Sequence, residues 1–492
     1  MAGRERVVVV GAGVGGLATA LALGRAGHPV TVIERDALPV VDGPEQAFAT
    51  ERRGAPQAHQ THGFLARIVA VLGERFPDVL ADLRAAGCTV LPPALDLGDA
   101  QPGDEDLVVL AMRRTTFEWV LRRAVTAEPG IEVRSGVGVT GLTVAEPADG
   151  DCGRPRVDGV RLEDGSHRPA GMVVAATGRR GPVPAWLAEV GVEVDETVHE
   201  SGLVYLTRWY RLPEGVDLQL DPKLGGDLGY VKYLGVPGDG GTLSITLAVR
   251  THDAELRVAL SDADRFERAC RALPGPDQFF AIGPLEPIGG VRPMGGLLNR
   301  LRRFTAGDQP AVLGFHAVGD AHTCTNPLYG RGCTLALVQA VLLADAAAAH
   351  PGDPWGRAEA YEAACAREVE PWFDLAVQTD QSGADPTGFG AGRDGSTGEG
   401  DGEGAAPLTP QAKAMSALFV AGATDPVIGR ALARLWNLLD TPAALAAKPE
   451  VVARMAAVMA DPDAYPPPPR EGPTRRELLA ALGPTEEAAS HA

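Results

Sequence analysis

A glycine-rich turn between a buried strand and a helix constrains this chain more than any other feature. Residues 7–10 are four valines, typical of a buried parallel strand, and the apolar stretch over 17–23 continues at helical spacing. Between them, Gly11, Gly13 and Gly16 fit the pattern G-x-G-x-x-G. The first glycine permits a tight turn, the second lets the backbone approach a pyrophosphate, and the third lets helix and strand pack closely. The phosphates would then face the free N–H groups and the positive end of the helix dipole.

A second strand completes the nucleotide-binding unit. The apolar run over 30–33 ends in Glu34, 23 residues after Gly11. A carboxylate at this place accepts hydrogen bonds from the ribose hydroxyls of an adenosine. The same glycine spacing recurs over 136–141, but a strand-like alternation follows it instead of a helix. We therefore predict dinucleotide binding at the N-terminal copy; the alternative is a strand–helix turn that holds no ligand.

Composition and charge exclude several classes of function. The net charge of −19 argues against nucleic acid and anionic membranes as main partners, because both need basic patches. The six cysteines are scattered without a C-x-x-C pair, so we expect neither a metal site nor a disulfide framework. A reduced, cytoplasmic environment fits this pattern. The uncharged residues 7–24 are explained by the glycine turn rather than by a membrane span.

A loop over residues 51–64 carries several polar candidates: Arg52, Arg53, Gln57, His59 and His62. One interpretation is a solvated basic loop before an amphipathic helix that starts near Phe64. The other places Arg52 or Arg53, together with Gln57, beside a diphosphate or the reactive ring of a cofactor. His59 and His62 are either structural or line a substrate cavity.

Arg114 stands at the start of a predicted helix, with Thr115 or Thr116 as its cap. A cation is poorly placed against the positive end of a helix dipole unless an anion also lies there. Arg114 is therefore a candidate anion-binding residue.

The middle of the chain changes its pattern twice. A second buried strand over 172–175 leads into a turn at Gly178, and half-buried alternating strands between 201 and 249 predict a separate antiparallel sheet crossed by a helix over 262–273. Tyr205 and Trp209 lie in this sheet, either as ordinary packing residues or as part of a substrate cavity.

A third informative stretch begins where a strand ends at Gly319 and Asp320. An irregular loop follows, and a long alanine- and leucine-rich helix is predicted over 334–349. Asp320 is placed to accept hydrogen bonds from a polyol such as ribitol. Backbone N–H groups near Gly332 can hold a developing negative charge. The alternative is a plain loop that enters a core helix.

Together, the glycine turn with Glu34, Arg114, the turn at Gly178 and the Gly319-Asp320 pair resemble the FAD-dependent monooxygenases of the p-hydroxybenzoate hydroxylase fold. The segments 53–57 and 319–332 are most similar to the polyether-epoxidase branch, of the monensin and lasalocid type, and its actinobacterial relatives. The resemblance implies an α/β protein with a Rossmann-like FAD-binding domain, an antiparallel β-sheet substrate domain and a helical C-terminal region.

The resemblance also implies residue roles. Glu34 holds the adenosine ribose, Arg114 the diphosphate and Asp320 the ribitol, while the loop from Pro327 to Gly332 lies against the isoalloxazine. The full set of expected cofactor-binding residues is Gly11, Gly13, Gly16, Glu34, Arg35, Arg53, Gln57, Arg114, Gly178, Gly319, Asp320, Pro327, Gly330, Arg331 and Gly332.

The expected domains follow from this resemblance. Residues 1–195 and 301–380 form the two parts of the FAD-binding domain, and residues 196–300 form the substrate domain. A flexible linker rich in Gly and Asp covers 381–407. Helices over 408–492 either cover a substrate entrance or extend the core.

Two departures from the family pattern matter. The strand over 172–175 ends in Ala175 where the family usually has aspartate, so the role of that carboxylate is absent. The family's hydroxylases also often have a more explicit Asp-Gly motif there, shared by FAD and NADPH binding, and its absence here argues against direct use of NADPH. The tryptophan pair of flavin halogenases is also missing, which argues against halogenation.

The leading hypothesis is an FAD-dependent monooxygenase that epoxidises or hydroxylates an organic, secondary-metabolite substrate through a C4a-hydroperoxyflavin. Electrons come from NAD(P)H, directly or through a flavin reductase, and O₂ is the second substrate. The alternatives are an FAD-dependent dehydrogenase or alkene reductase on the same fold, and a flavin-binding accessory protein without turnover.

Overall fold

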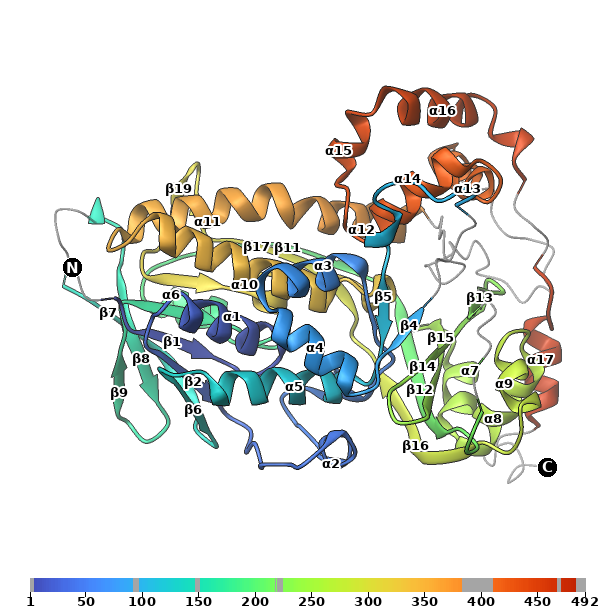
Figure 1. The fold of residues 1–492 in the computed structure, drawn as a ribbon, viewed down its shortest axis with the longest axis horizontal. Coiled ribbons are helices and arrows are strands. Elements are labelled where there is room, and N and C mark those ends of the chain that lie inside the picture. Colours follow the sequence, from blue (N-terminus) through green and yellow to red (C-terminus); the bar gives the residue numbers. More distant parts are fainter. Residues whose placement is uncertain are drawn as a thin grey trace.

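The computed structural model describes residues 4–91, 97–146, 151–216, 218, 224–382, 410–466 and 470–483. Figure 1 shows two lobes: a parallel sheet covered by helices, and an antiparallel sheet with helices of its own. The helices α13 to α16 lie above the junction of the lobes, and α17 lies against the second lobe. This confirms the predicted α/β fold class, with its antiparallel sheet and helical C-terminal region.

Five parallel strands form the sheet of the first lobe, in the order β20-β10-β1-β2-β6. Their bounds are β1 (Val7–Val10), β2 (Val30–Glu34), β6 (Ile131–Ser135), β10 (Met172–Ala175) and β20 (Phe315–Ala317). The central strand β1 is buried along its whole length, which explains its four consecutive valines. The predicted strand–helix–strand unit is confirmed, and β20 joins the sheet from a distant part of the chain.

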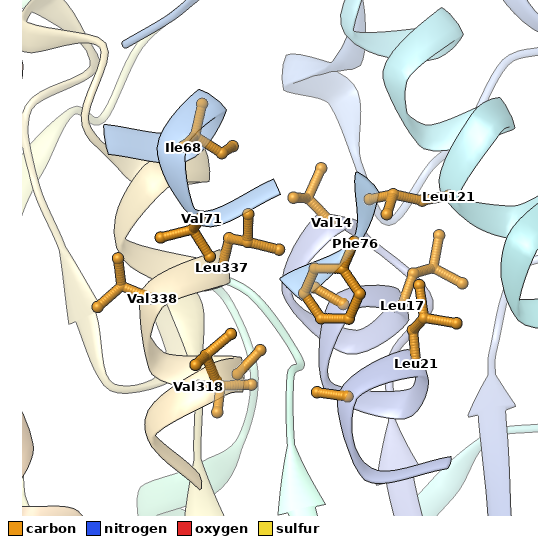
Figure 2. Close-up of a cluster of buried hydrophobic side chains, with 14 of the residues drawn as sticks. Val14, Leu17, Leu21, Ile68, Val71, Phe76, Leu121, Val318, Leu337 and Val338 are labelled. Atoms are coloured by element: carbon orange, nitrogen blue, oxygen red, sulfur yellow. The ribbon is translucent and has the colours of Figure 1, made fainter. Parts of the chain in front are cut away.

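Helices cover one face of this sheet. They share one apolar cluster and are α1 (Val14–Arg25), α3 (Ala66–Arg75), α4 (Pro77–Ala85), α5 (Arg114–Ala127) and α10 (Gly332–Ala349). Figure 2 shows Leu17 of α1 beside Phe76, with Leu337 of α10 nearby. A methyl group built at Gly15 would lie 3.4 Å from the Ala336 side chain, so the first turns of α1 and α10 lie side by side.

The other face of the sheet is covered by a small sheet of β7 (Val139–Val144), β8 (Val157–Leu162) and β9 (His167–Pro169), together with α6 (Val183–Glu189). Two further three-stranded sheets complete this lobe. One contains β3 (Gly63–Phe64), β4 (Thr89–Leu91) and β5 (Val109–Ala111), and the other contains β11 (Asp195–Glu200), β17 (Leu298–Arg303) and β21 (Thr323–Cys324). The short elements are α2 (Pro44–Ala49), β18 (Thr305–Ala306) and β19 (Gln309–Pro310).

The second lobe is built on an antiparallel sheet in the order β13-β14-β15-β12-β16. The strands are β12 (Leu203–Arg211), β13 (Gly225–Asp227), β14 (Val231–Pro237), β15 (Thr242–Arg250) and β16 (Glu286–Met294). α7 (Ala254–Ser261), α8 (Ala263–Ala272) and α9 (Pro276–Ala281) pack on one face. The prediction that these strands are only half-buried is wrong. Thr207 and Thr246 point to the face opposite these helices, yet they are 0% and 4% exposed. That face is covered by the first lobe.

The C-terminal helices extend the core of both lobes. They are α13 (Pro410–Gly422), α14 (Pro426–Trp436), α15 (Pro442–Ala446), α16 (Pro449–Ala460) and α17 (Arg475–Leu482). Leu478 and Leu482 of α17 are fully buried among the helices of the second lobe. Residues 383–407 of the predicted linker over 381–407 lie outside the described residues.

The helix α10 is long and apolar enough to resemble a membrane span, but 72% of it is buried inside the protein. It packs between α1 and α11 (Pro354–Glu368), and α12 (Glu370–Ser382) follows. The burial identifies α10 as a core helix, and its even apolar surface is what such a position requires.

The predicted threonine cap of α5 is wrong. The residue before the helix is Arg113, and no side chain of its own segment caps the helix. Instead, the Arg113 N–H donates to Asp239 Oδ1 at 2.8 Å, and the Thr116 hydroxyl donates to Asp239 Oδ2. A carboxylate from the second lobe therefore supplies the anion at this helix end.

Gly16→Ala tests the packing at the glycine turn. A methyl group at Gly16 would lie 1.8 Å from the Gly11 carbonyl oxygen, so the strand and helix must move apart. We expect the free energy of unfolding to fall by about 1–3 kcal/mol, as for overpacked cores. The matched control is Gly15→Ala, whose methyl meets Ala336 at 3.4 Å. Urea unfolding of both variants without cofactor checks this; equal losses would contradict it.

Candidate FAD site

The turn between β1 and α1 leaves the first N–H groups of α1 without a side-chain cap. Gly11 has φ +109°, and a methyl group there would lie 2.4 Å from the Ala176 carbonyl oxygen. Gly13 precedes α1, and no side chain caps the helix. Near Gly13, the closest atom to a built methyl group is Nη2 of Arg114, at 4.0 Å. An anion between them would meet both the helix dipole and a guanidinium.

A row of alternating charges runs beside this turn. Glu34 Oε2, at the end of β2, accepts hydrogen bonds from the Ala12 N–H at 2.8 Å and from Arg52 Nη2 at 2.9 Å. Arg52 Nη1 donates to Glu118 at 2.8 Å, and Arg114 Nε donates to the other oxygen of Glu118 at 2.8 Å. We call these four residues the charge row. A small cleft beside it is lined by Ala12, Leu17, Leu38 and Trp119, among others.

Electrostatics keep Glu118 of the charge row ionised. Burial by itself would raise the pKa of Glu118, but Arg114 and Arg52 more than offset this, so its pKa lies below the ordinary value. The loop offered Arg52 or Arg53 for this place, and Arg52 is the one that lies in the charge row. Arg53 is exposed, as is Arg35, and Gln57 is half-buried. The sequence analysis missed Glu118, although its spacing of four residues from Arg114 on one helix was a usable signal.

Asp320 follows β20 in a short helical turn over Gly319–Ala321, and its Oδ1 would lie 3.9 Å from a methyl group built at Gly332, where α10 begins. Its carboxylate accepts no hydrogen bond from any described residue, and burial raises its pKa although Arg114, Arg179 and Arg300 lower it. The backbone here is held firmly, because Arg300 donates to the Asp320 carbonyl at 2.9 Å and the Gly319 N–H donates to Gln339 at 2.8 Å. A buried carboxylate without donors is suited to the hydroxyls of a polyol.

The segment before α10, residues 325–332, is named here the α10 loop. It contains a short turn of helix over Pro327–Tyr329, and Gly330 takes a positive φ of +65°. A methyl group at Gly330 would lie 3.5 Å from the Gly63 carbonyl oxygen, so the loop faces the segment that carries His62. The Arg331 guanidinium is buried and lies against the rings of Tyr329, Trp372 and Trp436. Gly178 and Gly319 also have positive φ, and Gly332 opens α10.

The four predicted cavity residues meet where the two lobes join. Trp209 Nε1 donates to the His59 carbonyl at 2.7 Å, and the Tyr205 hydroxyl donates to Asn326 Oδ1 at 3.0 Å. His62 Nδ1 lies 2.9 Å from the Gln60 carbonyl. His59 Nε2 contacts the Phe48 carbonyl, and burial lowers the pKa of His59. In the described part of the chain, no group of three or more His, Cys, Asp or Glu side chains could hold a metal ion.

The residues present fit FAD. The uncapped turn with Arg114 suits a diphosphate, Glu34 suits a ribose, and the Asp320 carboxylate offers an acceptor for the hydroxyls of a ribitol.

Comparisons with known proteins show what the chain is similar to. Residues 6–97 match the family model described as FAD dependent oxidoreductase. Protein Rv3254 of Mycobacterium tuberculosis is 28% identical over 367 residues, which cover 68% of this chain and 72% of that protein.

Solved structures share the fold. The p-nitrophenol 4-monooxygenase PnpA from Pseudomonas putida has a TM-score of 0.60 and 19% identity, covering 89% of this chain and 99% of that one. The anhydrotetracycline hydroxylase OxyS from Streptomyces rimosus has a TM-score of 0.57 and 21% identity, covering 89% and 76%. Over residues 6–97 the chain is thus similar to FAD-dependent oxidoreductases, and it shares its fold with flavin monooxygenases of the p-hydroxybenzoate hydroxylase type.

Arg114→Gln tests the anion-binding role. The substitution removes the cation opposite Gly13 but leaves Glu118 paired with Arg52. A charge-assisted hydrogen bond contributes about 1.5–3 kcal/mol, so we expect FAD affinity to fall about 10- to 100-fold. Fluorescence titration of the apoprotein with FAD measures this. Arg123→Gln, an exposed arginine on the same helix, is the control, and equal affinities in both variants would contradict the role.

Because the pKa of His62 is lowered, we expect the protein to lose stability in acid. Burial and the nearby Arg114 lower its pKa to about 4. Because the unfolded chain binds this proton at about pH 6.5, stability is lost as pH falls from there toward 4. Relative to wild type, His62→Gln should lose about 2 kcal/mol less between about pH 7 and pH 5 in urea unfolding. His167→Gln, at an exposed position, should follow wild type; a His62→Gln curve parallel to wild type would refute the assignment.

Proposed function

We propose that this chain is a flavin monooxygenase that transfers one oxygen atom of O₂ to an organic small molecule. FAD, once reduced, supplies the activation of O₂. The overall reaction consumes two electrons and two protons, and the second oxygen atom leaves as water. The shared fold with PnpA, a monooxygenase, and OxyS, a hydroxylase, supports this class of reaction.

The observation that carries the proposal is the direct contact of the second sheet with both cofactor-side segments. Tyr205 of β12 donates to Asn326 of the α10 loop, and Thr207 of the same strand donates to Gln60 at 2.6 Å. A substrate on this face of β12 would therefore lie between the sheet and the segments proposed to hold the isoalloxazine. Such enclosure excludes water from the reacting atoms.

The chain's own residues have distinct roles in this proposal. Gly11, Gly13 and Gly16 shape the diphosphate turn, and Arg114 pairs with its charge. Glu34 orients the ribose and is itself oriented by Arg52. Asp320 holds the ribitol. Gly330 and Gly332 allow the α10 loop and the start of α10 to approach the ring, where the helix dipole stabilises negative charge.

The substrate we propose is an uncharged or largely apolar secondary metabolite, epoxidised or hydroxylated. Apolar side chains surround Tyr205 at the junction, namely Leu203, Leu234, Ala248, Met294, Leu297 and Leu328. These apolar contacts favour a substrate that is itself apolar where it meets the sheet. Electrons come from NAD(P)H, directly or through a flavin reductase, in a reduced cytoplasmic setting.

Photoreduction of the FAD-loaded protein, followed by rapid mixing with isotopically labelled O₂ and candidate polyenes and aromatics, tests the function. A monooxygenase should yield a product heavier by one labelled oxygen atom. Substrate turnover without oxygen incorporation would instead indicate the dehydrogenase or alkene reductase. FAD binding with no substrate-dependent change would indicate an accessory flavoprotein.

A further inference from the structure

Near its C-terminal end, the helix α12 carries a carboxylate, Asp380, that contacts the α10 loop. Asp380 accepts hydrogen bonds from Asn299 Nδ2 at 2.6 Å and from Asn326 Nδ2 at 3.1 Å, and the Tyr329 hydroxyl also donates to it. Asn299 lies on β17, whereas Asn326 and Tyr329 lie in the α10 loop. One carboxylate therefore ties a strand and two points of the loop to α12.

Asn326 extends this connection to the second lobe. Its Oδ1 accepts from the Tyr205 hydroxyl at 3.0 Å and from the Leu328 N–H at 3.2 Å, and its own N–H donates to Asn299 Oδ1 at 2.7 Å. Every polar group of the Asn326 side chain is thus bound, so its amide cannot flip without breaking several contacts. A shift of Asp380 would move the link between loop and sheet.

The other end of the loop is held by aromatic rings. The Arg331 guanidinium lies 4.8 Å from the ring centre of Tyr329, 5.6 Å from that of Trp372 and 5.4 Å from that of Trp436. Trp372 comes from α12 and Trp436 from α14. Arg331 therefore holds one side of the α10 loop against α12 and α14. The cofactor and the substrate would have to approach the loop from the other side.

We infer that Asp380 is the positioning residue that holds the α10 loop at a fixed distance from both the cofactor site and the substrate sheet. This inference rests on the proposed function for its consequence in catalysis, but its structural part concerns FAD alone. Asp380 touches neither substrate nor cofactor; it acts through Asn326 and Tyr329.

A carboxylate is needed here because three donors converge on it. The two oxygens of an ionised carboxylate accept all three hydrogen bonds, whereas an amide has one oxygen and a nitrogen that only donates. Asp380→Asn removes the negative charge and replaces one oxygen by a donor, so the Tyr329 hydroxyl must turn to accept from it or lose its partner. The charge-assisted contacts that hold the loop are weakened in either case, and the loop shifts. Because a misplacement of about 1 Å can cost about 100-fold in rate, small movements are measurable.

The experiment compares Asp380→Asn with wild type, both loaded with FAD. We expect labelled product per O₂ consumed to fall about 10- to 100-fold, with H₂O₂ released instead. We also expect a changed visible absorption spectrum of the bound flavin and easier quenching of its fluorescence by iodide. Asp374→Asn is the matched control, because Asp374 is exposed on the same helix, and it should behave as wild type.

Tyr205→Phe is the second variant, and it removes the hydrogen bond between the sheet and Asn326 without touching Asp380. It should also lower the coupling, that is, the labelled product formed per O₂ consumed. The free-energy cost calculated from this ratio should be smaller for the double variant than the sum of the costs of the two single variants. If Asp380→Asn does not fold, Tyr205→Phe with wild-type coupling and a wild-type flavin spectrum overturns the inference. An Asp380→Asn protein with the wild-type spectrum and iodide quenching overturns it as well.

These readouts separate the two proposals. If wild type yields no oxygenated product, the proposed function fails, yet the spectrum and iodide quenching of Asp380→Asn still report the loop. If wild type oxygenates its substrate and Asp380→Asn matches it, the function stands and the positioning role is refuted.

Discussion

The cofactor site depends on the charge row formed by Glu34, Arg52, Glu118 and Arg114. Charges removed from water are costly unless each finds a partner, and the row pairs them in alternation across β2, the loop after α2 and the helix α5. Because the four charges sum to zero, the excess positive potential comes from the ends of α1 and α10. A diphosphate would meet these helix ends and the Nη atoms of Arg114 rather than an unbalanced group of cations.

The C-terminal region belongs to the site as much as the glycine turn does. Asn437, just after α14, accepts from the Ala66 N–H and, through its backbone carbonyl, from the Arg67 N–H, so it caps α3. Trp436 packs on Tyr329 and Arg331, which fixes the rear of the α10 loop. The helix α14, close to the end of the sequence, therefore supports both α3 and the α10 loop, which come much earlier in the chain.

Local patterns predicted much of this fold, and the reasons are physical. The strands, α1, α10 and the place of Glu34 depend on neighbours within one strand–helix unit, where the period of apolar residues suffices. The errors arise from distant contacts. Thr116 could not cap α5 because its hydroxyl is bound to Asp239, and the second sheet is not half-exposed because Gln60 and Thr61 cover Thr207 and Thr246. Asp380 gives no local signal at all, since its partners lie on β17 and in the α10 loop.

Two adjacent arginines show how the lobes and the cofactor site share one element. Arg113 and Arg114 open α5, and successive residues of a helix point about 100° apart. Arg113 turns to the second lobe and pairs with Asp239, with both side chains only 1% exposed. Arg114 turns to Gly13 and the charge row. A shift of Asp239 relative to Arg113 would thus also move Arg114, because the two arginines are adjacent at the start of one helix. The junction of the lobes and the anion site are therefore not independent, and the geometry of one constrains the other.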